Sequence, residues 1–121
     1  MIDSLKDNEI FVFGSNMLGH HAGGAAKQAM DSFSAEWGIN EGLTGKCYAF
    51  PTLEREMTKR GMKALERSRD RLFATARALP EKTFLLTKVG CGIAGYSEEK
   101  IKPLFSNSPS NIVLPEDWRK S

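Results

Sequence analysis

The chain has 121 residues, of which 40% are hydrophobic and 26% charged, so its size and composition are those of one compact domain over residues 1–121. No stretch approaches the roughly 20 apolar residues that span a bilayer. The acidic start MIDSLKDNEI also lacks the basic and apolar regions of a secretory signal. These two features predict a cytoplasmic protein without a membrane partner. With 17 basic and 15 acidic side chains, the net charge of +2 creates no general field that would capture nucleic acid.

A strand and a helix, joined by a glycine-rich loop, are predicted at the start of the chain. The strand covers residues 9–14, a β-branched and aromatic run that stops at Gly-Ser-Asn, as buried strands of parallel sheets tend to do. Residues 19–24 favour a loop. From Ala25 to Trp37 helix formers dominate and apolar residues recur along one face, so the sequence predicts a helix there.

The rest of the chain alternates between predicted strands and helices. Pro51 closes one strand and Pro80 ends a long helix, because proline lacks the backbone donor that both elements use. The expected strands are 46–50, 83–89 and 111–114, and the expected helices are about 58–79 and 97–105. This order predicts an α/β fold, a three-layer α/β/α arrangement with a mostly parallel sheet, in which ligands bind beyond the carboxyl ends of the strands.

The strongest local signal for a ligand is the glycine-rich segment 89–97, which joins a strand to a helix start. Glycine lets the backbone approach a ligand closely, and free N–H groups at a helix start attract phosphate, so the segment predicts a diphosphate cradle. Gly90, Gly92 and Gly95 also fit the GxGxxG pattern of dinucleotide-binding units, with Glu116 in the place of the ribose-binding acid. A nicotinamide-cofactor site is therefore one alternative, and a tight turn that binds nothing is another.

A second glycine cluster, 14–26, joins a strand to a helix at the same edge of the sheet, and two such loops favour one extended polar ligand. The amide of Asn16 can both donate and accept, so it could bind ribose hydroxyls or orient a water, or it could only occupy a left-handed turn. His20 and His21 titrate near neutrality and are candidates for acid/base chemistry, with an exposed loop position as the alternative. No Cys, Asp or Glu lies at ligand spacing around them, so we expect no metal site.

Weaker signals lie near these loops. Tyr96 could lie along a ribose or base, or belong to the core, and Thr52 could add a polar contact at a strand end. The helix expected over 58–79 is rich in arginine and lysine, a pattern that nucleic-acid sites share. Because the whole chain is near neutral, a solvated helix face is the favoured interpretation and nucleic acid is not an expected partner.

With both loops in view, the chain resembles the macrodomain family of ADP-ribose-binding proteins, and most closely the short macrodomain-like proteins of bacteria and phages. The run Ile10 to Asn16 (IFVFGSN) is similar to the family's asparagine-ending strand, and residues 19–25 are similar to the glycine loop after it. Residues 89–96 resemble the phosphate-binding loop, which in one hydrolase subgroup begins with the same Gly-Cys-Gly. Where that subgroup carries an aspartate, this chain has Ala94 or Gly95.

The resemblance implies a role for each segment. Asn16 and the loop 19–24 would lie near the distal ribose, the backbone of 90–95 would hold the diphosphate, and Tyr96 would flank the distal ribose. Some family members only bind ADP-ribose, whereas others hydrolyse ADP-ribosyl linkages. The family usually has further strands before the asparagine-ending one, including an acid that reads the adenine. In this chain only Asp3 and Asp7 precede that strand, and neither is assigned the role.

We therefore expect a protein that binds ADP-ribose or a related NAD-derived nucleotide, free or attached to a macromolecule, with hydrolysis of ADP-ribosyl linkages as a further activity and no cofactor. The alternatives are a non-catalytic nucleotide-binding or sequestering protein and a nicotinamide-cofactor-binding protein. The candidate catalytic residues are Asn16, His20 and His21. The candidate ligand-binding residues are Gly14, Ser15, Gly19, Gly23, Gly24, Thr52, Gly90, Cys91, Gly92, Ile93, Ala94, Gly95 and Tyr96.

Overall fold

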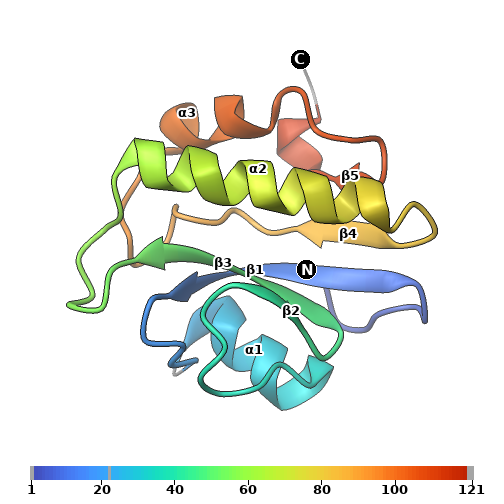
Figure 1. The fold of residues 1–121 in the computed structure, drawn as a ribbon, viewed down its shortest axis with the longest axis horizontal. Coiled ribbons are helices and arrows are strands. Elements are labelled where there is room, and N and C mark those ends of the chain that lie inside the picture. Colours follow the sequence, from blue (N-terminus) through green and yellow to red (C-terminus); the bar gives the residue numbers. More distant parts are fainter. Residues whose placement is uncertain (1, 22, 120–121) are drawn as a thin grey trace.

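The computed structural model describes residues 2–21 and 23–119 and has an α/β fold built on one five-stranded sheet (Figure 1). The strands are β1 (Glu9–Asn16), β2 (Gly42–Thr44), β3 (Cys47–Leu53), β4 (Thr83–Leu86) and β5 (Ile112–Val113). The helices are α1 (Gly24–Phe33), α2 (Met62–Ala78) and α3 (Glu98–Ile101), with 3-10 turns η1 (Lys102–Phe105) and η2 (Glu116–Trp118). Within the described ranges, no helix is long and apolar enough to cross a membrane.

The sheet is mixed, with strand order β2-β3-β1-β4-β5. Strand β1 lies at its centre and pairs in parallel with β3 and β4, and β5 continues the parallel part beside β4. Strand β2 pairs antiparallel with β3 and was not predicted. The parallel majority agrees with the expected α/β class, and it brings the carboxyl ends of β1, β3 and β4 to one edge.

Strand β3 runs through Pro51, where the sequence predicted its end. Strand β2 covers only Cys47–Ala49 of β3, so on that side the backbone of β3 has no partner strand at Pro51. A proline that lacks an N–H therefore costs no ladder hydrogen bond there. The extension carries Thr52 and Leu53 to the sheet edge where β1 ends.

Side chains of β1 alternate between two hydrophobic clusters, as the period of a strand requires. Ile10 and Val12 belong to the larger cluster, which includes buried residues of α2, α3 and η1. Phe11 and Phe13 belong to the smaller cluster, which α1 covers. Figure 1 shows α2 and α3 along one face of the sheet and α1 on the other.

Helix α1 ends at Phe33, before the predicted end at Trp37. Ser34 adopts a left-handed conformation (φ 68°), and the N–H groups of Ser34 and Ala35 both donate to the carbonyl of Ala29, which closes the helix. The prediction that this helix extends to Trp37 was therefore wrong. Trp37 lies in the segment between α1 and β2, with 53% of its surface exposed.

Candidate functional site

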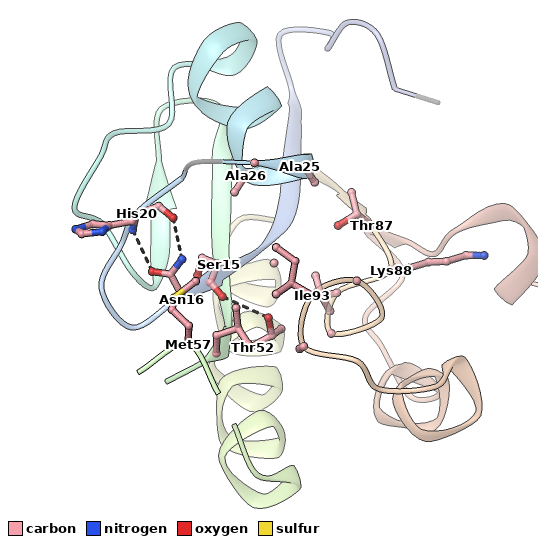
Figure 2. Close-up of a pocket in the computed structure, with 18 residues that line it drawn as sticks. Ser15, Asn16, His20, Ala25, Ala26, Thr52, Met57, Thr87, Lys88 and Ile93 are labelled. Atoms are coloured by element: carbon pink, nitrogen blue, oxygen red, sulfur yellow. Dashed lines mark hydrogen bonds between the residues drawn. The ribbon is translucent and has the colours of Figure 1, made fainter. Parts of the chain in front are cut away.

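A cleft of about 340 Å³ lies at the carboxyl ends of β1, β3 and β4 (Figure 2). The two glycine-rich loops form its opposite walls. A Cβ at Gly14 would lie 3.9 Å from the N atom of Gly90, so the end of β1 lies close to the loop after β4. The lining residues are Gly14, Ser15, Asn16, His20, Gly23, Gly24, Ala25, Ala26, Thr52, Leu53, Met57, Thr87, Lys88, Val89, Gly90, Gly92, Ile93 and Ala94.

The loop after β4 is a pair of tight turns that leave several amides unused. Tyr96 N–H donates to the Gly90 carbonyl at 2.9 Å, and Gly95 N–H donates to the Gly92 carbonyl at 2.9 Å. Gly90 has φ 81°, and a Cβ there would lie 3.1 Å from Ile101, so glycine suits the turn. The N–H groups of four residues in this wall donate to no residue of the described ranges: Gly90, Gly92, Ile93 and Ala94.

The opposite wall is the start of α1. Gly23 is the N-cap and supplies no side-chain cap, and the first turn holds no acidic residue. The first N–H groups of a helix have no partner within the helix, and the helix dipole gives them a partial positive charge. Gly24 and Ala25 contribute such groups, and both residues line the cleft.

No aspartate or glutamate lines the cleft, and its ionisable lining residues are His20 and Lys88. The ammonium of Lys88 pairs with Asp117 at 2.7 Å and Glu98 at 3.2 Å, and Figure 2 shows this side chain extending away from the cleft. These contacts raise the pKa of Lys88 and lower the pKa of Asp117. A hydrogen bond from Trp118, together with Lys88, lowers the pKa of Glu98. The positive character of the cleft therefore comes from backbone amides and a helix start.

The polar side chains from β1 and β3 that line the cleft also brace it. The Asn16 amide donates to the His20 carbonyl at 2.8 Å and accepts from the His20 N–H at 3.0 Å. Ser15 donates to the Asn40 carbonyl at 2.6 Å, and Thr52 donates to the Ser15 carbonyl at 3.3 Å. Asn16 thus holds the loop after β1, with both ends of its amide engaged (Figure 2).

The two adjacent histidines occupy different environments. His20 is exposed and borders the cleft. His21 is fully buried against Phe13 and its Nε2 lies 3.0 Å from the Glu36 carbonyl, whereas its Nδ1 has no partner among the described residues. Burial lowers the pKa of the His21 imidazole below its ordinary value of 6.5. His21 is therefore a core residue outside the cleft. The sequence left open which of the two histidines faces the cleft, and in the structure it is His20.

Four further residues named from the sequence do not line the cleft: Gly19, Cys91, Gly95 and Tyr96. The Tyr96 hydroxyl donates to the Arg60 carbonyl at 2.5 Å, and the Lys59 ammonium lies 4.6 Å from the centre of its ring. Tyr96 therefore ties the glycine loop to the segment before α2. Burial raises the pKa of the Cys91 thiol, which is half-buried beside the loop.

Seven lining residues are not among the site residues proposed from the sequence, although three of them lie within its two glycine-rich segments: Ala25, Ala26, Leu53, Met57, Thr87, Lys88 and Val89. Most are direct neighbours of residues that were named. Met57 is different, because it lies at the tip of a hairpin loop in which Leu53 pairs with Lys59, and its φ is 66°. Thr87 lies at the cleft wall and its hydroxyl donates to the Val12 carbonyl at 2.7 Å.

A second cavity of about 460 Å³ adjoins the cleft and shares Ala25, Thr87 and Lys88 with it. Leu85 and Val113, which are neighbours across β4 and β5, line it. Its polar lining residues include Gln28, Glu116 and Arg119. The side chains of Gln28 and Arg119 donate to backbone carbonyls, whereas Glu116 makes no side-chain hydrogen bond to another residue in 2–21 or 23–119.

Two expectations about cofactors can be compared with this geometry. The helix that follows the GxGxxG pattern, α3, has only four residues, and Glu116 lines the second cavity instead of the cleft. Among the described residues, no group of three or more His, Cys, Asp or Glu could hold a metal ion. Comparison of the chain with family models, curated proteins and solved structures found no match.

Proposed function

We propose that the cleft and the adjoining cavity bind a nucleotide that contains a diphosphate, with ADP-ribose or another NAD-derived nucleotide as the ligand. One observation carries this proposal: backbone amides without a described partner lie on both walls of a cleft that no carboxylate lines. Such amides, together with a helix start, are donors suited to phosphate oxygens. A dianionic group between the walls would satisfy donors that the described chain leaves unused.

The second cavity supports a ligand longer than a diphosphate. Its apolar lining from β4 and β5 suits the face of a base, and it joins the cleft at Thr87 and Lys88. The Glu116 carboxylate would accept a hydrogen bond from an exocyclic amino group such as that of adenine. Glu116 is thus our candidate for the base-reading residue, which the sequence did not identify.

The side chains favour binding over turnover. General acid/base catalysis needs a group positioned to move a proton, and the lining offers no carboxylate for that purpose. The Asn16 amide is engaged with the backbone of His20, and Figure 2 shows the His20 ring turned away from the middle of the cleft. We therefore place ADP-ribose binding before hydrolysis as the proposed function.

A macrodomain-like three-layer arrangement is part of the same proposal, supported by helices on both faces of the sheet.

Calorimetric titration with ADP-ribose, AMP, ribose 5-phosphate and pyrophosphate tests the proposal. We expect ADP-ribose to bind most tightly, because it alone of these ligands combines a diphosphate for the cleft with a base for the second cavity. Gly92→Asp should weaken ADP-ribose binding at least ten-fold, since a carboxylate would then face the diphosphate. Nothing lies within 4 Å of a Cβ at Gly92, so we expect the fold to accommodate the substitution.

The matched control is Gly61→Asp, which adds the same charge at the N-cap of α2, outside the cleft lining and also without a neighbour within 4 Å. This variant should bind ADP-ribose like the unmodified protein. Equal binding by the Gly92→Asp and Gly61→Asp variants would contradict the proposal, and so would a lack of binding by all four ligands.

A further inference from the structure

An exposed pair of stacked rings lies beyond one end of the cleft. The rings of His20 and Trp37 have centroids 4.6 Å apart and planes inclined by 19°. His20 is exposed, and Trp37 exposes 53% of its surface. The second tryptophan of the chain, Trp118, exposes only 4%. Large aromatic side chains contribute most to folding when buried, so an exposed ring stack beside a cleft points to binding.

The chain fixes this pair through close backbone contacts. Gly38 N–H donates to the Gly19 carbonyl at 2.8 Å, and the Asn40 amide donates to the Met17 carbonyl at 3.2 Å. A Cβ at Gly19 would lie 2.5 Å from the carbonyl carbon of Gly38, so only glycine permits this approach. The segment that carries Trp37 is therefore held against the loop that carries His20, and the two rings are preorganised.

The position of the pair relates it to the far end of a bound nucleotide. His20 borders the cleft, and Figure 2 shows its ring beyond the cleft at the end opposite Thr87 and Lys88. The second cavity begins at Thr87 and Lys88. A ligand with its base in that cavity and its diphosphate between the glycine walls would direct its second ribose toward His20.

We propose that the His20–Trp37 pair is a stacking platform for a planar heteroaromatic ring on that second ribose, so that the preferred ligand is a dinucleotide with a pyridine-type ring, such as NAD, over ADP-ribose. This inference rests on the proposed function and names the ligand class of the same site. The exposed indole attracts a flat ring by stacking, and the cationic pyridinium of NAD adds a cation–π contribution.

Titration with NAD and with ADP-ribose, followed by calorimetry and by tryptophan fluorescence, tests the platform. We expect NAD to bind about five-fold or more tightly than ADP-ribose and to quench the fluorescence of the exposed Trp37. Trp37→Leu should reduce NAD affinity to that of ADP-ribose while leaving ADP-ribose affinity unchanged. Trp37→Phe, which keeps a flat ring, should retain part of the preference for NAD.

Leu43→Ala is the matched control, because Leu43 is also an exposed apolar residue (49%) and lines neither cavity. It should bind both ligands like the unmodified protein. Equal affinity of the unmodified protein for NAD and ADP-ribose, or a Trp37→Leu variant that keeps the preference for NAD, would overturn the platform and leave the diphosphate site standing. Failure of both ligands to bind would overturn the proposed function and the platform together.

Discussion

The side-chain amide of Asn16 and the backbone of His20 form a reciprocal pair of hydrogen bonds, donor to carbonyl at 2.8 Å and N–H to acceptor at 3.0 Å. Asn16 is 5% exposed, and both bonds are partly buried. The pair shapes the loop after β1 and fixes where His20 projects. A residue that the sequence suggested for catalysis is thus, in the structure, a brace of the cleft wall.

Replacement of Asn16 by alanine should therefore lower the free energy of unfolding. Two hydrogen bonds of about 1 kcal/mol each are lost, and the His20 carbonyl loses its partner, so we expect a loss of about 2 kcal/mol. Urea unfolding followed by circular dichroism measures it. The control is Asn107→Ala, at an exposed asparagine, which should change stability by less than about 0.5 kcal/mol. Equal stability of the two variants would show that the Asn16 bonds contribute nothing.

Gly19→Ala should be more damaging than a glycine substitution elsewhere in the cleft loops. Gly19 has φ 73°, and its added Cβ would collide with the backbone of Gly38, which cannot give way as a flexible side chain could. We expect a loss of more than about 2 kcal/mol, seen as a lower melting temperature. Gly92→Ala, which meets nothing within 4 Å, is the comparison and should stay close to the unmodified protein. Similar melting temperatures for the two variants would argue against the close approach.

The stability of the protein should fall as pH drops below about 6.5, because of His21. The folded chain resists protonation of this buried imidazole, whereas the unfolded chain takes up the proton near its ordinary pKa of 6.5. The unfolded state therefore binds more protons from pH 6.5 down to the folded pKa, and the slope reaches at most about 1.4 kcal/mol per pH unit. Unfolding free energies measured between pH 7 and pH 5 report it.

His21→Gln should remove this pH dependence, although it lowers stability at every pH. His20→Gln is the control, since His20 is exposed, and this variant should keep the slope of the unmodified protein. Glu98 and Asp117 contribute only at lower pH, because the pKa values of these two carboxyl groups lie below their ordinary values. A slope that survives in the His21→Gln variant would assign the effect to another group.

Lys88→Ala should leave ADP-ribose affinity within about two-fold of the unmodified protein. Its ammonium pairs with Glu98 and Asp117 and extends away from the cleft, so two exposed ion pairs are lost without loss of a phosphate contact. Calorimetric titration checks this expectation. A large loss of affinity would mean that the Lys88 ammonium, and not the backbone amides, binds the phosphate groups.

Most of the fold could be predicted because its main elements have strong local patterns. The aromatic and β-branched run of β1 and the long apolar periodicity of α2 were both recognised, and Pro80 follows closely after α2. Strand β2 could not be recognised, since a strand of three residues that begins with Gly42 carries no period, and it exists through pairing with β3. The end of α1 depends on the left-handed Ser34, which no local signal marks.

The candidate site was predictable in its backbone and less so in its side chains. Glycine-rich loops after two parallel strands identify a sheet edge, and residues of both loops line one cleft. Which histidine is buried and which borders the cleft depends on which ring packs against Phe13, and that is a tertiary contact. Met57 reaches the cleft from a hairpin loop formed by the pairing of Leu53 with Lys59, and no property of its own sequence segment indicates that position.

The short outer strands have a consequence for how copies of the chain meet in solution. Unpaired strand edges are templates on which another chain can add a strand, and long flat edges promote aggregation. Here β2 ends one side of the sheet after three residues and β5 ends the other after two, while Pro51 interrupts the donors of β3 where β2 no longer covers it. Among the described residues, neither side of the sheet offers a continuous ladder, so edge-to-edge strand addition between copies of the chain should be disfavoured.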